Sequence, residues 1–336
     1  MTVTNLKLPK NLIATIQSTR FSYGSAAHLP IFLWLTSFLV VALALLPFGY
    51  LIIRASGAGY EKVWGILLQS RTHQIFLNSA GLAATVTIAS IVIGVSLAWL
   101  TVRTDLPGRK VWSVLTALPL VIPSYVGAFA LVSALGPKGL VQGWLEPLGI
   151  DRLPSIYGFF GAWLAMTLFT YPYVLLSVRA ALRGLDPSLE EAARSLGRSP
   201  WQVFREVTVP HLRPAMLAGG LLVALYTLSD FGAVSMLRFD TFTRAIYMQY
   251  SASFDRSVAA VLALLLVALT IVILSFEVKM RGKARYYRSS SGTVRPTKPV
   301  SLGKWRVPAL MFCWLITGLG LVVPLAVIGY WLVRGA

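Results

Sequence analysis

Seven long apolar stretches constrain what this chain can fold into more than any other feature. They cover residues 31–53, 78–102, 111–136, 156–178, 215–237, 257–276 and 307–333. A helix needs about 20 predominantly apolar residues to cross the hydrocarbon core of a bilayer, and each stretch is long enough. Only 12% of the residues are charged, about half the share found in a soluble domain. The sequence therefore predicts an all-α, polytopic membrane protein with seven spans.

The distribution of basic residues predicts the orientation of the chain. If the N-terminal segment 1–30 is cytoplasmic, the inner segments hold 21 of the 30 lysines and arginines. Basic residues gather in cytoplasmic loops, so we expect the N-terminus inside and the C-terminus outside. The formal net charge of +18 is then a topology signal, and it requires no nucleic-acid partner.

A short repeat indicates a duplicated architecture. Gly-Tyr-Leu-Ile-Ile-Arg at 49–54 recurs 280 residues later as Gly-Tyr-Trp-Leu-Val-Arg at 329–334, and each copy closes an apolar stretch. We expect a six-span domain over 31–277, a basic cytoplasmic linker over 278–306, and the first span of an incomplete second half over 307–336. The serines, glycine and prolines of the linker predict flexibility. Its basic residues are expected mainly to anchor the cytoplasmic side, and contact with anionic lipid headgroups is the alternative.

The cytoplasmic segment 185–214 carries the capping signals of two short helices. Asp186 can accept hydrogen bonds from free N–H groups, and Pro187 suits the first helical position. Gly197 is a typical end for this first helix. The segment is therefore predicted to be structured rather than a simple connector.

The second helix of this segment is predicted to begin at Ser199. Pro200 suits its first position, and Gln202 completes a capping box with the serine. Pro210 and Pro214 are expected to end the helix before the next span begins.

Trp201, Phe204 and Val207 are expected to share one face of this second helix. Two interpretations of such an apolar face are open. It can pack against the ends of the protein's own spans, or it can fill the groove of a partner protein.

The same segment resembles the EAA loop of permease subunits in binding-protein-dependent ABC importers. The matching positions are Glu191, Ala192, Ala193, Gly197, Phe204, Val207, Val209, Pro210 and Pro214. Further segments resemble the ferric-iron class of these permeases, and they lie at 78–79, 98–100, 103–109, 118–126 and 229–233. The likeness covers residues 30–280.

The resemblance implies a six-span permease component of an ATP-driven importer in the bacterial inner membrane. Its partners would be cytoplasmic ATPase subunits, a periplasmic binding protein and a second permease half. Ferric iron is the expected cargo, and thiamine, phosphonate, polyamine or an inorganic anion is the alternative. A non-transporting membrane scaffold or fragment is a rival of another class.

The resemblance also assigns roles within the loop. Glu191 and Gly197 would fix its geometry, and the helix 200–207 would transmit the movement of the ATPase to the spans. The residues expected to couple to the ATPase are Glu191, Ala192, Ala193, Gly197, Pro200, Trp201, Phe204, Val207 and Pro210.

The chain departs from the ferric-iron class in having one such loop, because permeases of that class usually fuse two halves. A second loop would fall near residue 471, beyond Ala336. Either the chain is a shortened form of a fused permease, which we favour, or a second copy supplies the other loop.

Asp230 is the one carboxylate well inside an apolar stretch, and such residues are by default candidates for function. It is predicted either to lie in the cargo path, with Ser229, Tyr125 and Pro123, or to make an interhelical hydrogen bond with Ser229 or a tyrosine as neighbour. Pro119 and Pro123 either break the third span at a cavity or only kink it.

The sequence predicts no catalytic or metal site and no cofactor. His28, His73 and His211 lie far apart, without metal-ligand spacing. A phosphate-binding G-x-x-x-x-G-K-[ST] motif is absent from the sequence, so ATP and Mg²⁺ are expected on the partner ATPase. We expect a transporter subunit rather than an enzyme.

Overall fold

The structure, a computed structural model, describes part of the chain. The described residues are 31–137, 139–149, 154–252, 256–281 and 299–335. The chain divides into two units, Met1–Tyr50 and Leu51–Ala336. In the first unit the described residues form most of α2 (Ile31–Ser56), an apolar helix with Pro47 inside it. The predicted N-terminal segment 1–30 lies outside the described residues.

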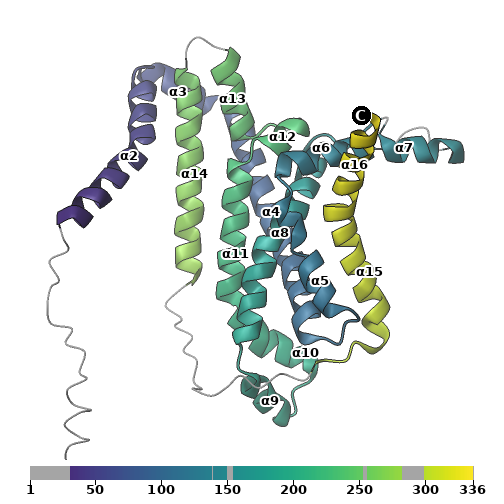
Figure 1. The fold of residues 1–336 in the computed structure, drawn as a ribbon. Helices are drawn as coiled ribbons and strands as arrows, with labels where there is room; N and C mark the ends of the chain where they lie inside the picture. The colour runs from purple at the N-terminus through teal and green to yellow at the C-terminus, as the bar shows by residue number, and fades with distance from the viewer. Residues whose placement is uncertain (1–30, 138, 150–153, 253–255, 282–298, 336) are drawn as a thin grey trace, which may run out of the picture. The chain divides into compact units, whose positions relative to one another are not determined.

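The second unit is built from helices (Figure 1), and its described residues contain no strand. In chain order these are α3 (Tyr60–Leu68), α4 (Ser70–Arg103), α5 (Arg109–Leu115), the 3-10 helix η1 (Leu118–Val121), α6 (Ser124–Leu135), α7 (Leu140–Leu145), the 3-10 helix η2 (Glu146–Leu148), α8 (Phe159–Gly184), α9 (Pro187–Ser195), α10 (Pro200–Val203), the π-helix η3 (Phe204–Thr208), α11 (Val209–Ser229), α12 (Gly232–Met236), α13 (Phe242–Ala252), α14 (Ser257–Arg281), the 3-10 helix η4 (Gly303–Trp305), α15 (Arg306–Thr317), the π-helix η5 (Gly318–Val322) and α16 (Val323–Gly335). Seven helical stretches of the described chain are long and apolar enough to cross a membrane. The predicted all-α, seven-span architecture is confirmed.

Three spans, α4, α8 and α11, pack side by side and form the centre of the second unit (Figure 1). Two glycines allow this close approach. A Cβ atom on Gly94 would lie 2.9 Å from the backbone nitrogen of Leu175, and one on Gly219 would lie 2.7 Å from the Cα atom of Val174. Small residues at helix interfaces let backbones come together in membranes, so α4 and α11 both press against α8 at these points.

The single predicted span over 111–136 is wrong. The structure divides this segment into α5, η1 and α6, and the membrane-length stretch begins only at Ser124 (Ser124–Gly143). Pro119 and Pro123 have no N–H to donate and therefore interrupt the helical ladder. The prolines break the span rather than only kinking it.

Two side chains of α8 satisfy carbonyl groups that this break leaves outside the helical ladder. The Tyr171 hydroxyl donates to the carbonyl oxygen of Thr116 at 2.6 Å. The Arg179 guanidinium donates to the carbonyl oxygen of Ser113 at 2.6 Å. Broken helices persist in membranes where neighbouring groups supply such partners, so α8 makes the interruption stable.

The seventh span, formed by α15, η5 and α16, packs against the six-span body rather than standing apart from it. Cys313 is fully buried in the main core, and Trp314 meets Trp112 of α5 edge-to-face at 5.2 Å. Further along, α16 packs against α6 (Figure 1). The seventh span therefore completes the core around the broken third span.

Residues 299–306 are attached to the turn after α4 and do not form a free linker. Val300 pairs in parallel with Thr104, and the N–H of Leu302 donates to Asp105 Oδ1 at 2.8 Å. Arg306 forms an ion pair with the same carboxylate. These bonds hold the pKa of Asp105 below its ordinary value, and the hydrogen bond from Arg306 has the largest effect. Flexibility predicted for the earlier part, 282–298, falls outside the described residues.

Candidate functional site

The first helix of the cytoplasmic segment, α9, begins as its sequence predicts. Asp186 takes the N-cap position, and its Oδ1 accepts the N–H of Ser188 at 3.0 Å. A carboxylate at this position also interacts favourably with the helix dipole. The predicted start of the first helix is confirmed.

A Schellman motif ends α9 at Gly197. The N–H of Gly197 bonds the carbonyl oxygen of Arg194 at 2.9 Å, and the N–H of Arg198 bonds that of Ala193 at 3.2 Å. Gly197 has φ of +80°, the left-handed conformation that glycine adopts without penalty. A Cβ atom at this position would meet nothing within 4 Å. Glycine is therefore favoured by the backbone conformation and not by lack of space.

The predicted capping box then starts α10. The N–H of Ser199 donates to Gln202 Oε1 at 2.8 Å, and the N–H of Gln202 donates to Ser199 Oγ at 3.3 Å. The capping residues of the segment are therefore sufficient to specify its helix–turn–helix form.

The predicted end of the second helix is wrong. α10 continues through η3 into α11, so one helical stretch runs from Trp201 to Ser229. The N–H of Val209 bonds the carbonyl oxygen of Phe204, five residues back. Because the helical stretch is continuous, Pro210 and Pro214 both lie within it, where neither supplies an N–H to the hydrogen-bond ladder. The fifth span thus starts earlier than predicted, and it ends at Ser229 instead of 237.

The predicted common face of Trp201, Phe204 and Val207 is only partly exposed. Trp201 is 67% exposed, whereas the ring of Phe204 lies 4.7 Å from that of Trp99 on α4, and Val207 is half-buried. The π-helical turn widens the spacing and directs these two side chains toward the body. The contact of Phe204 with Trp99 agrees with internal packing, and Trp201 stacks on Phe204 while remaining largely exposed. Docking of this face into the groove of a partner stays a prediction.

An exposed leucine at the tip of the turn was missed by the sequence reasoning. Leu196 is 83% exposed, beside Gly197. Glu191 and Ala192 on α9 are also exposed, and Ala193 is half-buried. The apex of the loop, defined here by Leu196 and Trp201, is therefore the apolar surface that the segment presents.

A buried ion pair joins the loop to α4, and the sequence reasoning did not find it. Arg103 Nη2 lies 3.4 Å from Glu190 Oε1, and their side chains are only 3% and 6% exposed. Thr208 Oγ1 donates to the same carboxylate oxygen at 3.1 Å. Glu190 thus connects α9, the π-helical turn and the end of α4. The two adjacent glutamates at 190–191 could have indicated this contact, because neighbouring residues of a helix point in different directions. In the structure Glu190 is buried and Glu191 is exposed.

The residues predicted for a cargo path come together at the far end of the spans. Ser124, which follows Pro123 at the start of α6, donates its hydroxyl proton to Asp230, and Asp230 Oδ1 accepts the N–H of Ala233 at 2.8 Å. Tyr125 is 54% exposed. Asp230 therefore makes an interhelical hydrogen bond as predicted, but its partner is Ser124 rather than Ser229 or a tyrosine. It also accepts an N–H in the first turn of α12, while Ser229 donates to the carbonyl oxygen of Tyr226 in its own helix at 3.0 Å.

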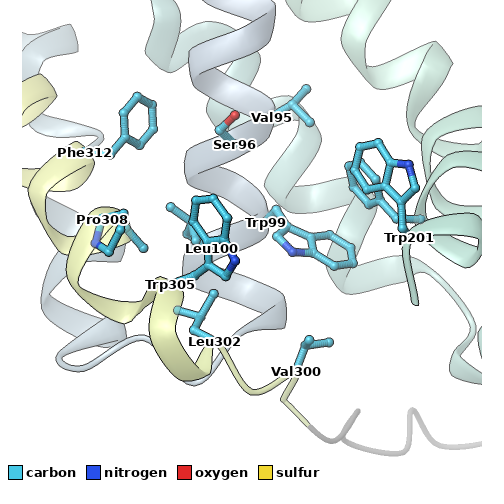
Figure 2. A pocket seen from close by; sticks show the side chains of 12 residues that line it. Val95, Ser96, Trp99, Leu100, Trp201, Val300, Leu302, Trp305, Pro308 and Phe312 are labelled. Atoms are coloured by element: carbon cyan, nitrogen blue, oxygen red, sulfur yellow. The ribbon is translucent and has the colours of Figure 1, made fainter. Parts of the chain in front are cut away.

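A groove of about 790 Å³ lies beside the loop (Figure 2). It runs between α15 and α10, across the end of α4, and eleven of its twelve lining residues are apolar. Three tryptophans border it, Trp99, Trp201 and Trp305. Within the described residues, no group of three or more His, Cys, Asp or Glu side chains is placed to hold a metal ion.

The structure thus combines membrane-length helices, a capped loop between two of them and a buried ion pair that joins the loop to α4. The chain belongs to the family described as "Binding-protein-dependent transport system inner membrane component", whose profile matches residues 90–279. It is accordingly a multi-pass inner-membrane permease subunit of an ABC transporter, and not an enzyme.

Individual relatives differ in their named cargo. The Fe(3+)-transport system permease protein FbpB 2 of Haemophilus influenzae is 36% identical over 306 residues, which are 90% of this chain and 57% of that relative. The sulfate transport system permease protein CysT of Escherichia coli is 32% identical over 203 residues, 59% of this chain and 71% of the relative. The chain thus spans little more than half the length of the iron-transport relative.

A solved structure supports the fold. The bacterial alginate ABC transporter, in complex with a pentasaccharide-bound periplasmic protein, contains a chain that matches with a TM-score of 0.60 at 18% identity. The match covers 75% of this chain and 94% of that one.

The conformation of Gly197 leads to a specific expectation. Gly197→Val should destabilise the turn by about 1–2 kcal/mol, because a β-branched residue is strained in the left-handed region, and Gly197→Asn should cost less. Hydrogen exchange of the amides at 186–208 in reconstituted protein measures this. Gly184→Val is the control, since Gly184 has open space and no positive φ. Equal exchange in the two valine variants would contradict the expectation.

Proposed function

We propose that this chain is a permease component of an ATP-driven importer for ferric iron, moving cargo from a periplasmic binding protein to the cytoplasm. Support for iron comes from a likeness that extends over 90% of the chain, whereas the sulfate relative matches 59% of it. ATP and Mg²⁺ are held by a separate ATPase, and this chain binds no cofactor of its own.

The observation that carries the coupling role is the rigid link between the loop apex and the spans. The apex of the loop, Leu196 and Trp201, fits a groove on an ATPase subunit, in the helix-in-groove mode. The buried ion pair of Glu190 and Arg103 fixes the loop to α4, and the helix from Trp201 continues into α11. When the ATPase pair closes, two spans are moved at once, which suits alternating access.

The remaining coupling residues position the apex of the loop or connect it to α11. Glu191, Ala192 and Ala193 form the outer turns of α9 and contact the ATPase, while Gly197 and Pro200 set the angle between the helices. Phe204, Val207 and Pro210 carry the movement into α11.

The orientation and the remaining partners follow from the same proposal. The N-terminus lies in the cytoplasm, since most basic residues fall on that side. A second permease half, from a longer form of the chain or from another copy, supplies the second loop for the ATPase pair. The cluster of Pro123, Tyr125, Ser229 and Asp230 lies along the cargo path, near the binding protein.

Oxyanion import is the second candidate, because sulfate and molybdate permeases also match. The molybdenum transport system permease protein ModB of Escherichia coli is 31% identical over 216 residues, 62% of this chain and 93% of the relative. The residues of this chain do not physically distinguish the two cargo classes.

Uptake measurements in the native host test the proposal. Deleting the gene should abolish accumulation of radioactive ferric iron and leave labelled sulfate and molybdate uptake unchanged. Restoring the wild-type gene should recover iron uptake, whereas Glu191→Lys should not, although the variant still inserts in the membrane. Loss of oxyanion uptake instead would support the second candidate, and wild-type uptake by Glu191→Lys would overturn the coupling role.

A further inference from the structure

The groove beside the loop lies where the chain passes from the membrane to its surface. Of the lining residues, Val95 on α4 and Phe312 on α15 lie farthest along their helices from the charged ends. They lie about 12 Å and about 9 Å along their helices from Arg103 and Arg306, the charged ends of those helices. The inner part of the groove is thus at hydrocarbon depth, and its mouth is at the headgroup level.

The lining has the chemistry of an acyl-chain site. Ser96 is its one polar side chain, and the Ser96 hydroxyl already donates to the carbonyl oxygen of Val92 at 2.7 Å. Apart from the indole N–H groups, the lining contains no other side chain that can form hydrogen bonds. Trp201 and Trp305 stand at the mouth, 67% and 72% exposed, and tryptophan is typical of the membrane–water interface.

Two exposed cations are next to lining residues in the sequence, one in η4 and one in η3. Lys304 stands between the lining residues Leu302 and Trp305, and Arg205 follows the lining residue Phe204; both cations are exposed. Neither forms an ion pair with a described residue, whereas Arg306 is engaged by Asp105. A positive mouth over an apolar groove complements an anionic headgroup joined to an acyl chain.

We propose that this groove binds an anionic phospholipid of the cytoplasmic leaflet. One acyl chain lies between α15 and α10 over α4, and the phosphate lies between Lys304 and Arg205. The lipid then contacts α4 and α15 together. The assignment to the cytoplasmic leaflet rests on the proposed orientation, but the binding itself does not depend on the cargo or on the ATPase.

Photocrosslinking with phosphatidylglycerol carrying a diazirine near the middle of one acyl chain tests the site. The full-length protein is reconstituted in nanodiscs of phosphatidylcholine with a small fraction of the probe, and labelled peptides are mapped by mass spectrometry. Labels should concentrate on residues 95–100 and 305–312. Ser96→Trp, which fills the groove, should remove them, while Ile88→Trp, an exposed position two turns farther along the same helix, should not.

A second measurement avoids any bulky substitution. Lys304→Ala and Arg205→Ala should each lower the preference for phosphatidylglycerol over phosphatidylcholine by about fivefold, and Lys110→Ala, an exposed lysine on α5, should not. Even labelling along all lipid-facing residues would overturn the proposal. So would labels unaffected by Ser96→Trp, or a groove that stays unlabelled because another protein segment covers it. Failure of iron uptake would affect only the proposed function.

Discussion

Replacing Glu190 with leucine is expected to destabilise the protein by about 3–5 kcal/mol, because the change removes the carboxylate that faces Arg103 while the guanidinium stays buried. Thr208 also loses its acceptor. The neighbouring Glu191 is exposed, so its replacement by leucine should leave thermal stability nearly unchanged. Thermal unfolding of the detergent-solubilised variants, followed by intrinsic fluorescence, measures the difference.

A double-mutant cycle separates the ion pair from the shape of the site. Glu190→Leu with Arg103→Leu should regain much of the lost stability, since a buried pair can often be replaced by apolar residues. Glu206→Leu is the control, because its pair with Arg198 is about half exposed and contributes about 0–1 kcal/mol. If Glu190→Leu unfolds at the temperature of Glu206→Leu, the ion pair does not hold the loop.

The second large effect is expected at the glycines between the central spans. Gly94→Leu and Gly219→Leu each place side-chain atoms against the backbone of α8, which cannot rotate away as a flexible side chain would. Overpacking of this kind costs about 1–3 kcal/mol or more. We expect less protein in the membrane and a lower unfolding temperature for both variants, measured by fluorescence-detected size-exclusion chromatography.

Gly81 supplies the matched control on the same helix. A Cβ atom there would meet nothing within 4 Å, so Gly81→Leu should accumulate like the wild type. If Gly81→Leu and Gly94→Leu accumulate equally, the close approach of α4 and α8 does not depend on the lack of a side chain at Gly94.

The sequence predicts well the features that depend on local chemistry. Apolar length is sufficient to find seven spans, and the caps at Asp186, Gly197 and Ser199 are found from residues within a turn of one another. Each of these signals lies inside the segment that it shapes. Their prediction needs no knowledge of which other part of the chain lies nearby.

The missed features depend on distant partners. The break before Ser124 is stable because Tyr171 and Arg179, more than 50 residues away, supply hydrogen bonds. The inward position of Glu190 depends on Arg103, and hydropathy alone cannot place one glutamate of a pair inside and the other outside. The passage of α10 into α11 requires a π-helical turn, whose spacing a 3.6-residue pattern does not describe.

The attachment of residues 299–306 to the end of α4 also has a consequence for the order of assembly. Asp105 and Leu302 are 197 residues apart in the chain. At about 5–20 residues per second, roughly 10–40 s of synthesis separate them. During that interval the third to sixth spans are made, while Trp112 lacks its partner Trp314 and the core beside the broken third span is open on one side. The face where the seventh span docks is therefore covered only after the six preceding spans have been made, so that a chain interrupted before residue 306 exposes an apolar surface there.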